Sequence, residues 1–451
     1  MRCTRPLADR HRALGALLLV SMLGAAVAAA ACSSSESDAH NELESDAAVS
    51  NSNDATTSSD VTDATAANDA SDAELFDGGA PLAVTCAQQP CAHALTGATR
   101  SSGTFCVLLD QGKVACWGRN GFYDLGRGAD AGMTQSPVPQ EVVGIENAIA
   151  IEETCAILQG GAVKCWGPGN FLQPDPPFNP MYPEPVTLPI PPVRSLSIDA
   201  FSKVGCAVLL TGEMSCWGFV APYRVDGGGT IYDSDGKQLE RFPLPGGFDP
   251  VEVKVGEASF VRDAKGAVLS WGSRASLGRI SSLKVDPDAL PITLTGITAM
   301  DAAANAACAI TQGKVYCWGS SSDYNATNNV PLHALPELVA LPAPAIAVSV
   351  GSILGVAAHP FACAVTANHE LYCWGDNSRG QIGDGTIGNI AYFPVKVDLP
   401  GRVVSVSTLM YDACALLESG QVYCWGDNTQ GELGRGTLGK GKPTPGLVVF
   451  P

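Results

Sequence analysis

Basic side chains are scarce in this 451-residue sequence, which has 27 Lys and Arg against 45 Asp and Glu. The net charge is −18, and binding to nucleic acid needs clustered Lys and Arg, so nucleic acid is not an expected partner. Long helices are not expected either, because 49 Gly and 31 Pro would interrupt them. This composition favours many short strands joined by turns.

The motifs of common active sites are also absent. The sequence has no Gly-Lys-Ser/Thr phosphate loop, no Gly-x-Ser-x-Gly elbow and no His-Glu-x-x-His, and its six His show no metal-ligand spacing. Residues 233–236 (Asp-Ser-Asp-Gly) resemble part of a calcium loop, but later ligands are missing, so a polar turn is the better interpretation. We therefore expect no cofactor, no metal and no catalytic residue. An enzyme stays open as an alternative, because active sites can be assembled from distant loops.

The first 31 residues have the pattern of a secretion signal of the lipoprotein type. Four Arg precede an apolar run from Ala13 to Ala31, in which Ser21 is the only strongly polar residue. Cys32 follows three Ala as in a bacterial lipobox, although Ala29 stands where Leu is commoner. We expect Cys32 to be lipidated, which would hold the protein at the cell envelope. Ordinary cleavage at the Ala-x-Ala site would secrete it instead, and a spanning helix is the weaker interpretation.

Residues 32–80 are predicted to form a disordered acidic tether. Residues 33–80 contain twelve Asp or Glu and no Lys or Arg, and the remainder is mostly Ser, Ala, Thr and Asn. Such a stretch buries too little apolar surface to offset the entropy lost on ordering. As a flexible chain it would span roughly 40 Å, enough to hold a folded domain away from a membrane.

A repeat organises the remaining part, residues 81–451. All seven Trp of the chain are followed by Gly, at intervals of 49, 51, 54, 47, 56 and 51 residues: Trp117, Trp166, Trp217, Trp271, Trp318, Trp374 and Trp425. A period of this length indicates a repeat architecture. Before the Trp, two apolar runs flank a turn that usually contains Gly, which predicts a β-hairpin. In the sixth repeat we expect Asn368 to adopt the turn conformation.

Cysteines occupy facing positions of these predicted hairpins. Cys106 and Cys116 come opposite each other across a three-residue loop. In the fifth repeat the loop is one residue shorter, and so is the spacing from Cys308 to Cys317, so these two cysteines still face each other. The fourth repeat has Phe260 and Ser270 in these positions, so both cysteines are missing together. Facing residues lie close enough for a disulfide. The predicted pairs are Cys106–Cys116, Cys155–Cys165, Cys206–Cys216, Cys308–Cys317, Cys363–Cys373, Cys414–Cys424 and, before the first hairpin, Cys86–Cys91.

The even number of paired cysteines suits an oxidising compartment. Zinc sites are the weaker alternative for the hairpin cysteines, because zinc ligands are usually two to four residues apart and these are nine or ten apart.

The pattern resembles the regulator of chromosome condensation repeat family, whose hallmark is a hairpin ending in Trp-Gly, then Asn, then Gly-Gln-Leu-Gly. Residues 374–383 read Trp-Gly-Asp-Asn-Ser-Arg-Gly-Gln-Ile-Gly, and residues 425–434 read Trp-Gly-Asp-Asn-Thr-Gln-Gly-Glu-Leu-Gly. The first repeat has Asn120, Leu125 and Gly126, and the other repeats keep less of the motif. The resemblance covers residues 92–451 and implies an all-β fold, a seven-bladed β-propeller of four-stranded blades.

A propeller ring has to be closed. Residues 445–450 match the apolar strand that follows other repeats, but no Trp-Gly unit comes after them. We expect this C-terminal strand to join the first blade and clasp the two chain ends, so that its removal would open an edge on that blade.

The long insertions between repeats provide the candidate binding loops, because binding residues concentrate in loops on a rigid scaffold. The candidates are Tyr223, Arg224, Tyr232 and Arg241 in residues 219–250, and Tyr324 in residues 319–346. A tolerated insertion without a binding role is the alternative.

These observations predict a monomeric, non-catalytic binding propeller at the cell envelope. Its expected partner is a protein or a glycan, and it would contact the membrane only through a lipid anchor. One alternative is an enzyme that cleaves polysaccharide or peptide, which carboxylates with Tyr or Arg at the propeller mouth would favour. Another is an inhibitor of a secreted enzyme, because one branch of the family blocks β-lactamase. Nucleotide exchange on a small nuclear GTPase, the family's better-known activity, is not expected for an exported chain.

Overall fold

The computed structural model describes residues 82–86, 89–98, 103–169, 171–172, 181–199, 204–218, 239–283, 285–303, 306–319, 333–351 and 360–451. They belong to one compact unit, Ser71–Pro451. The predicted signal sequence, Cys32 and the whole of the predicted tether lie outside the described residues. Within the described part, no helix has the length and apolar character to cross a membrane.

Seven antiparallel four-stranded sheets form the fold, and in each sheet the strand order follows the chain. Blades 1 to 4 comprise β1 (Ala92–Ala98), β2 (Thr104–Leu109), β3 (Val114–Gly118), β4 (Ser136–Glu141); β5 (Ala148–Glu152), β6 (Cys155–Leu158), β7 (Val163–Pro168), β8 (Met181–Thr187); β9 (Val193–Asp199), β10 (Val204–Leu209), β11 (Met214–Gly218), β12 (Glu240–Arg241); β13 (Pro250–Lys254), β14 (Ala258–Asp263), β15 (Val268–Ser273), β16 (Val285–Pro291).

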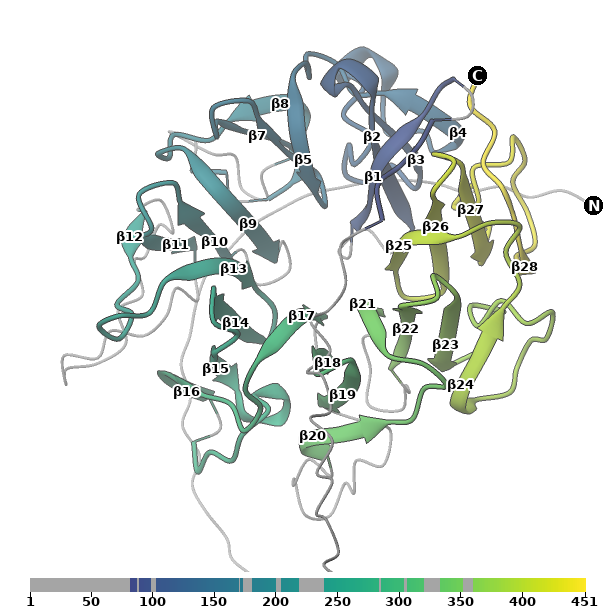
Figure 1. Ribbon diagram of the computed structural model, residues 1–451. Coiled ribbons are helices and arrows are strands. Elements are labelled where there is room, and N and C mark those ends of the chain that lie inside the picture. The colour runs from purple at the N-terminus through teal and green to yellow at the C-terminus, as the bar shows by residue number, and fades with distance from the viewer. Residues whose placement is uncertain are drawn as a thin grey trace, which may run out of the picture. The chain divides into compact units, whose positions relative to one another are not determined.

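Blades 5 to 7 comprise β17 (Ile297–Ala302), β18 (Ala306–Thr311), β19 (Lys314–Gly319), β20 (His333–Val339); β21 (Ala345–Gly351), β22 (Phe361–Thr366), β23 (Leu371–Gly375), β24 (Ala391–Val397); β25 (Val403–Thr408), β26 (Asp412–Leu417), β27 (Val422–Gly426), β28 (Lys442–Leu447). Three 3-10 turns accompany them, η1 (Asp110–Gly112), η2 (Ala129–Ala131) and η3 (Arg274–Ser276). The first strand of each blade lies nearest the centre of the ring (Figure 1). The predicted all-β, seven-bladed propeller is confirmed.

The two middle strands of a blade are buried on both faces because a neighbouring blade covers each face. In blade 1, β2 reads TFCVLL and β3 reads VACWG, and nearly every residue of both is buried. The outermost strand is more exposed, as β4 shows with its mixed burial. This layering explains why the hairpin strands are continuous apolar runs without polar alternation.

The hairpin turns use left-handed backbone conformations. Gln111 and Gly112 have φ of 60° and 68°, and the shorter turn of blade 5 is made by Gln312 and Gly313 at 51° and 70°. In blade 6 the left-handed residue is His369, with φ of 60°, and not Asn368 as the sequence suggested. His369 comes six residues after the first hairpin cysteine, which is the position of Gly112 in blade 1.

Buried apolar clusters fill the seven junctions between neighbouring blades. The cluster between blades 1 and 2 contains Val114, Leu125 and Trp166, and that between blades 6 and 7 contains Leu371, Ile382 and Trp425. In each junction the Trp comes from the later blade, so the core of the ring is a series of blade contacts, each built around one Trp-Gly residue.

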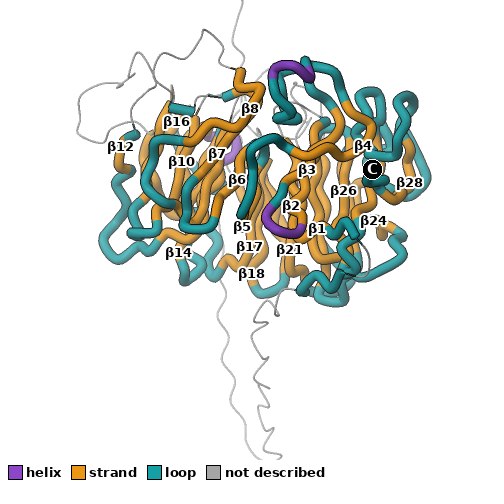
Figure 2. Tube along the Cα trace, turned by 90° about the horizontal axis from the view of Figure 1, so that it is seen from above, coloured by secondary structure: helices purple, strands orange, loops and turns teal. Residues whose placement is uncertain are grey.

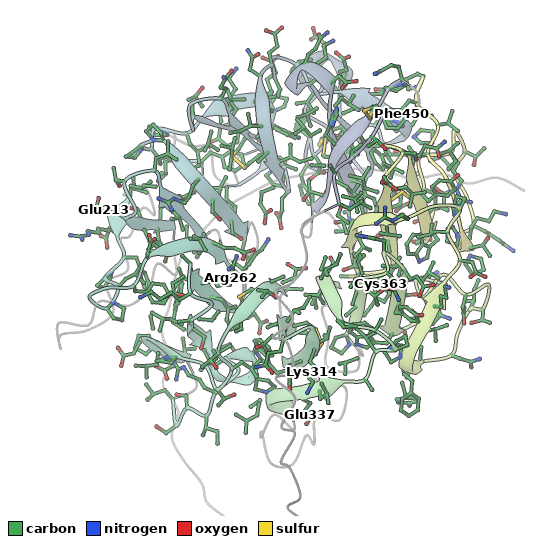
Figure 3. The ribbon with its side chains drawn as sticks, in the orientation of Figure 1. Glu213, Arg262, Lys314, Glu337, Cys363 and Phe450 are labelled. Carbon is green, nitrogen blue, oxygen red and sulfur yellow. A yellow bond between two sulfur atoms is a disulfide. The ribbon has the colours of Figure 1, made fainter. Side chains whose placement is uncertain are left out.

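The structure joins the cysteines in the seven predicted pairs, six of them within hairpins and Cys86–Cys91 before the first hairpin. In six blades the two residues face each other on the second and third strands, with Cα atoms 4.0–4.1 Å apart. In blade 4, Phe260 faces Ser270 in the same register. Figure 3 labels Cys363 of one such pair on β22.

The expected closure of the ring by the C-terminal strand is wrong. β28 pairs with β27 of its own blade, and the first blade is complete with β1 to β4. The backbone N–H of Ala92 in blade 1 donates to Gly420 O in blade 7 at 3.1 Å. The equivalent hydrogen bond between blades 6 and 7 runs from the N–H of Val403 to His369 O. The seam between blades 7 and 1 is therefore an ordinary blade junction without a covalent connection.

Segments at both chain ends cover this seam. The N–H of Thr85 donates to Glu418 O at 2.7 Å, and Val84 packs on the seam cluster. After β28, Val448 is buried in the same cluster and Phe450 packs against it, where Figure 3 labels it. The C-terminus thus contributes side chains to the junction with blade 1, and not a strand.

Candidate functional site

The alternation of strands sorts the connections onto two faces of the ring. Connections between first and second strands and between third and fourth strands open on one face, which we name the loop face. The hairpin turns and the links between blades open on the other, the turn face. The edge-on view in Figure 2 shows the strands crossing the ring between these two sets of connections.

A cavity of about 320 Å³ lies at the centre of the loop face, and we name it the mouth. The loop-face ends of the first strands line it, from β1, β5, β9, β13, β17, β21 and β25. Hydrogen bonds from backbone N–H groups to side chains of the preceding first strand join neighbouring blades here. They link Glu153 N to Thr96 Oγ1, Val255 N to Ser197 Oγ and Thr408 N to Ser349 Oγ, each at 3.1 Å. These contacts hold the lining of the mouth in place.

The charges of the mouth are mostly negative. Its lining contains five carboxylates and one ammonium, a formal charge of −4 when all are ionised: Glu152, Glu153, Asp199, Glu257, Asp301 and Lys254. Walls of low dielectric strengthen the field of such a group, so the mouth attracts cations.

Lys254 joins three blades through its partly buried ammonium. Its Nζ lies 3.0 Å from Glu152 Oε1 and 4.0 Å from Asp301 Oδ1. Burial by itself lowers the pKa of Lys254, but the nearby carboxylates outweigh burial and raise this pKa above its usual value. Burial raises the pKa of Asp301, which Lys254 and the N–H of Val350 (2.8 Å from Asp301 Oδ2) partly offset. Lys254 therefore stays charged and screens two carboxylates of the mouth.

Asp199 and Glu257 form a second carboxylate group of the mouth. Burial and the charge of Asp199 raise the pKa of Glu257. A carboxyl with a raised pKa keeps its proton to a higher pH than usual, which is a property of general acids as well as of structural carboxyls.

A second hollow of about 530 Å³ lies on the loop face above the seam between blades 7 and 1. Arg119, Tyr411, Asp427 and Glu432 are among its lining residues. Burial raises the pKa of Glu432 to about 7, with a further contribution from Asp427. Burial and these two carboxylates raise the pKa of Asp412 well above its usual value. The seam thus contains three interacting carboxyls.

The repeat motif explains why this cluster is unusual. In blade 6, Gln381 Nε2 donates to Asp376 Oδ2 at 2.8 Å, while its Oε1 accepts from Arg379 N. In blade 7, Glu432 replaces this Gln; its Oε2 accepts from Gln430 N at 2.7 Å, and a carboxyl oxygen takes the place of the amide donor. The carboxyl of Asp427 therefore receives no hydrogen bond from an amide at position 432, unlike the carboxyl of Asp376 in blade 6.

The predicted binding-loop residues are placed as follows. Tyr223, Arg224, Tyr232 and Tyr324 lie outside the described residues, in connections that begin and end on the loop face. Arg241 belongs to β12 and not to a loop, and its Nε lies 3.4 Å from Glu213 Oε1. Because Glu213 lies in the hairpin turn before β11, Arg241 is at the turn-face end of the blade, away from the mouth.

The sequence analysis missed the charged lining of the mouth. A usable signal exists: Glu152, Asp199, Lys254 and Asp301 come 14 to 18 residues before the Trp of their own repeats, next to an apolar strand. A charged residue repeating in that phase predicts a ring of charge around a propeller axis.

Comparison with protein families places these features in context. The family model described as the regulator of chromosome condensation (RCC1) repeat matches residues 361–381 and 413–432, in blades 6 and 7. The E3 ubiquitin-protein ligase HERC2 of Mus musculus is 27% identical over 239 residues, which are 50% of this chain and 5% of HERC2. The Protein RCC2 homolog of Xenopus laevis is 31% identical over 94 residues, 19% of this chain and 17% of that protein. The chain thus spans a small part of the length of these relatives.

Solved structures with the same architecture include Prp20p from Saccharomyces cerevisiae, with a TM-score of 0.59, 19% identity and coverage of 81% of this chain and 87% of that one. The yeast RCC1 (Prp20) bound to Kap60 has a TM-score of 0.58, 18% identity and coverage of 82% and 88%. Human WBSCR16 has a TM-score of 0.57, 16% identity and coverage of 75% and 94%. These likenesses show a common fold. With the seven Trp-Gly hairpins and the repeat match, they identify the chain as a seven-bladed β-propeller of the RCC1-repeat type.

Proposed function

We propose that this protein is a non-catalytic binding propeller that holds a protein partner on its loop face. The observation that carries the proposal is the concentration of features there: the acidic mouth, the seam hollow and the longest connections of the chain all belong to this face. The turn face carries short turns. Propellers of this fold are described with protein partners, Kap60 for yeast RCC1 and Gsp1p and histones for Prp20p, which supports a protein partner of this chain as well.

The charge of the mouth indicates the chemistry of the partner. Five carboxylates against one Lys favour a partner segment rich in Lys or Arg, and such attraction weakens as salt screens the charges. We therefore expect binding to weaken several-fold when salt is raised from about 0.05 M to about 0.5 M.

A capture experiment with matched variants tests the binding face. Residues 81–451 would be immobilised and used to recover partners from envelope and culture-medium fractions, and the affinity of a recovered partner would then be measured. Replacing residues 219–238 with a Gly-Ser linker, or combining Glu153→Gln with Glu257→Gln, should weaken binding at least tenfold. Arg241→Ala, at the turn-face end of β12, is the control and should change nothing. Recovery of no partner, or equal loss in the control, would contradict the proposal.

An enzyme that cleaves polysaccharide or peptide is the second candidate, and the Asp199–Glu257 group favours it. Among the described residues that line the mouth there is no Tyr or Arg, although we expected one of these beside the carboxylates of such an enzyme. Incubation with polysaccharide and peptide libraries tests this candidate. Turnover that Glu257→Gln abolishes would establish it, and turnover that Glu257→Gln leaves intact would exclude these carboxylates.

We also propose that Cys32 anchors the chain to a membrane of the cell envelope, as the lipobox-like sequence suggests. Expression in a bacterium fed an alkyne-tagged fatty acid should label the wild type and leave Cys32→Ala unlabelled. Labelling of both, or of neither, would count against the anchor.

A further inference from the structure

A group of possible metal ligands lies where the chain enters blade 1. Among the described residues, Cys86, Cys91 and His93 are the group whose ligand atoms all lie within 4.8 Å of one another. His93 Nε2 is 3.9 Å from Cys86 Sγ and 2.6 Å from Asp110 Oδ1 in η1. Cys86 and Cys91 are bonded to each other, and a disulfide is not a metal ligand because the ligand form of Cys is the thiolate.

This disulfide differs from the six in the hairpins. Four residues lie between Cys86 and Cys91, within the two to four that usually lie between zinc-binding cysteines, whereas eight or nine residues lie between the hairpin cysteines. Cys86 is exposed to solvent, whereas Cys106, Cys116, Cys363 and Cys373 are fully buried. A reductant in solution therefore reaches Cys86–Cys91 before it reaches those hairpins.

We propose that reduction of Cys86–Cys91 creates a zinc site made of the two thiolates, His93 Nε2 and the Asp110 carboxylate. A dithiol reductant gives two electrons and two protons to the disulfide and itself becomes a disulfide, leaving two thiols on the protein. Zn²⁺ then binds to both sulfurs and displaces their two protons into solvent. His93 coordinates through Nε2 and keeps its single proton on Nδ1.

Cys86 and His93 already lie at a distance that suits this set, and the two sulfurs can separate once the bond between them is reduced. Zinc bonds of about 2.3 Å to sulfur and about 2.0 Å to nitrogen put tetrahedral ligands about 3.5 Å apart, close to the 3.9 Å between Cys86 Sγ and His93 Nε2. Asp110 lies outside the group of Cys86, Cys91 and His93, so its carboxylate has to turn toward the sulfurs as the metal replaces the proton between it and Nε2. Both side chains are part-exposed and free to adjust.

The site would keep the ring seam fastened in either redox state. Cys91 contacts Gly420 of blade 7, and the backbone on either side bonds to the same turn through Thr85 and Ala92. In the oxidised protein the disulfide restrains residues 86–91 at the seam, and in the reduced protein bound zinc would restrain the same residues.

Cobalt binding after mild reduction tests the proposal. Residues 81–451 would be treated with a dithiol until mass spectrometry shows two free thiols, freed of reductant without oxygen, and titrated with Co²⁺. We expect one Co²⁺ per chain, with thiolate charge-transfer bands and the intense visible bands of a tetrahedral site, displaced by Zn²⁺. The oxidised protein should show none of these bands. Reduced protein that binds no Co²⁺ would overturn the proposal.

Variants identify the ligands. His93→Ala and Asp110→Asn should each weaken Co²⁺ binding at least tenfold without changing the thiol count, while His369→Ala, in the corresponding turn of blade 6, should have no effect. Alkylating the two thiols of the folded, reduced wild type should abolish binding, which avoids a Cys variant that fails to fold. Binding that survives alkylation or His93→Ala would place the metal elsewhere and refute the assignment.

Discussion

Each tryptophan of the repeat acts across a blade boundary. In four of them the indole Nε1 is seen to donate to a backbone carbonyl of the preceding blade, as in Trp425 to Gln381 O at 2.7 Å and Trp117 to Glu432 O at 2.8 Å. The last Gly of the motif lies against this indole; a Cβ on Gly383 would come within 2.7 Å of Trp425 Nε1. The last Gly of the motif therefore leaves the space that the Trp of the next blade occupies.

Trp425→Phe tests this residue-scale contact. The substitution leaves the buried carbonyl of Gln381 without its donor and opens a small cavity, so the free energy of unfolding should fall by about 2–4 kcal/mol. Trp374→Phe is the matched control; Trp374 is only partly buried, and its loss should cost less than about 1.5 kcal/mol. Urea unfolding followed by fluorescence measures both, and equal losses would contradict the account.

Lys254→Met tests the charge balance of the mouth. Glu152 and Asp301 would lose their cation, so at pH 7 we expect a loss of about 3 kcal/mol or more in unfolding free energy. The loss should shrink at pH 4 because protonated carboxyls need no counter-charge. Lys164→Met, at an exposed Lys that bonds a carbonyl, is the control and should have little effect at either pH. A loss that did not vary with pH would point to packing instead.

Blade 4, which lacks the hairpin disulfide, has a buried ion pair beside the strand that carries Ser270. Arg279, buried, donates from Nη1 to Asp286 Oδ2 at 2.7 Å and from Nη2 to Ser270 O at 3.0 Å. Ser270 stands where the other blades have the second hairpin cysteine. Because Asp286 lies in β16, this ion pair ties the two outer strands together by charged hydrogen bonds.

At the same scale, the hairpin disulfides are expected to contribute to stability individually. Cys363→Ala combined with Cys373→Ala should lower the free energy of unfolding by about 2–3 kcal/mol, because the short closed loop no longer restrains the unfolded chain. Chemical denaturation of the double variant and the wild type under non-reducing conditions measures this difference. No change would mean that β22 and β23 are held by packing alone.

Glu432→Gln tests the carboxyl cluster of blade 7. A carboxyl whose pKa is raised to about 7 in the folded state binds its proton more tightly than in the unfolded chain. Its contribution to stability is complete below the unfolded pKa and is lost as pH rises through about 7. Glu432→Gln should remove this decline and raise the unfolding free energy at pH 8 by about 1–3 kcal/mol.

The reverse substitution in blade 6 is the matched control for this pH dependence. Gln381→Glu would remove the amide that donates to Asp376, and it should introduce a new loss of stability above neutral pH. Thermal unfolding from pH 4 to pH 8 measures both variants. Parallel curves for Glu432→Gln and the wild type would contradict the assignment.

For the whole molecule, the seam between blades 7 and 1 is the junction that the chain does not cross. Ending the chain at Leu447 removes Val448 and Phe450 from the seam cluster and two backbone hydrogen bonds, to Val422 O and Gly434 O. We expect a loss of about 2–4 kcal/mol in unfolding free energy. Deleting Pro451 alone, an exposed residue, is the control. Because β28 stays paired with β27, the far-ultraviolet circular dichroism should keep its strand signal.

Local sequence was enough to predict the repeat, the hairpins and the cysteine pairs. A hairpin joins residues nine or ten positions apart, so the register of Cys106 and Cys116 follows from the length of a single turn. The Trp-Gly spacing likewise predicts seven equivalent units before any contact is known. The left-handed position in blade 6 was misplaced by one residue, at Asn368 and not His369, because neither residue is Gly.

Only the tertiary structure decided how the ring closes and what meets at its centre. β28 pairs with β27 of its own blade, and blade 1 has no place for it because residues 92–141 already supply all four strands of that blade. Glu152, Lys254 and Asp301 come from blades 2, 4 and 5 and meet because seven first strands surround one axis. Local sequence determines each blade, whereas contacts between residues a hundred or more positions apart depend on the geometry of the whole ring.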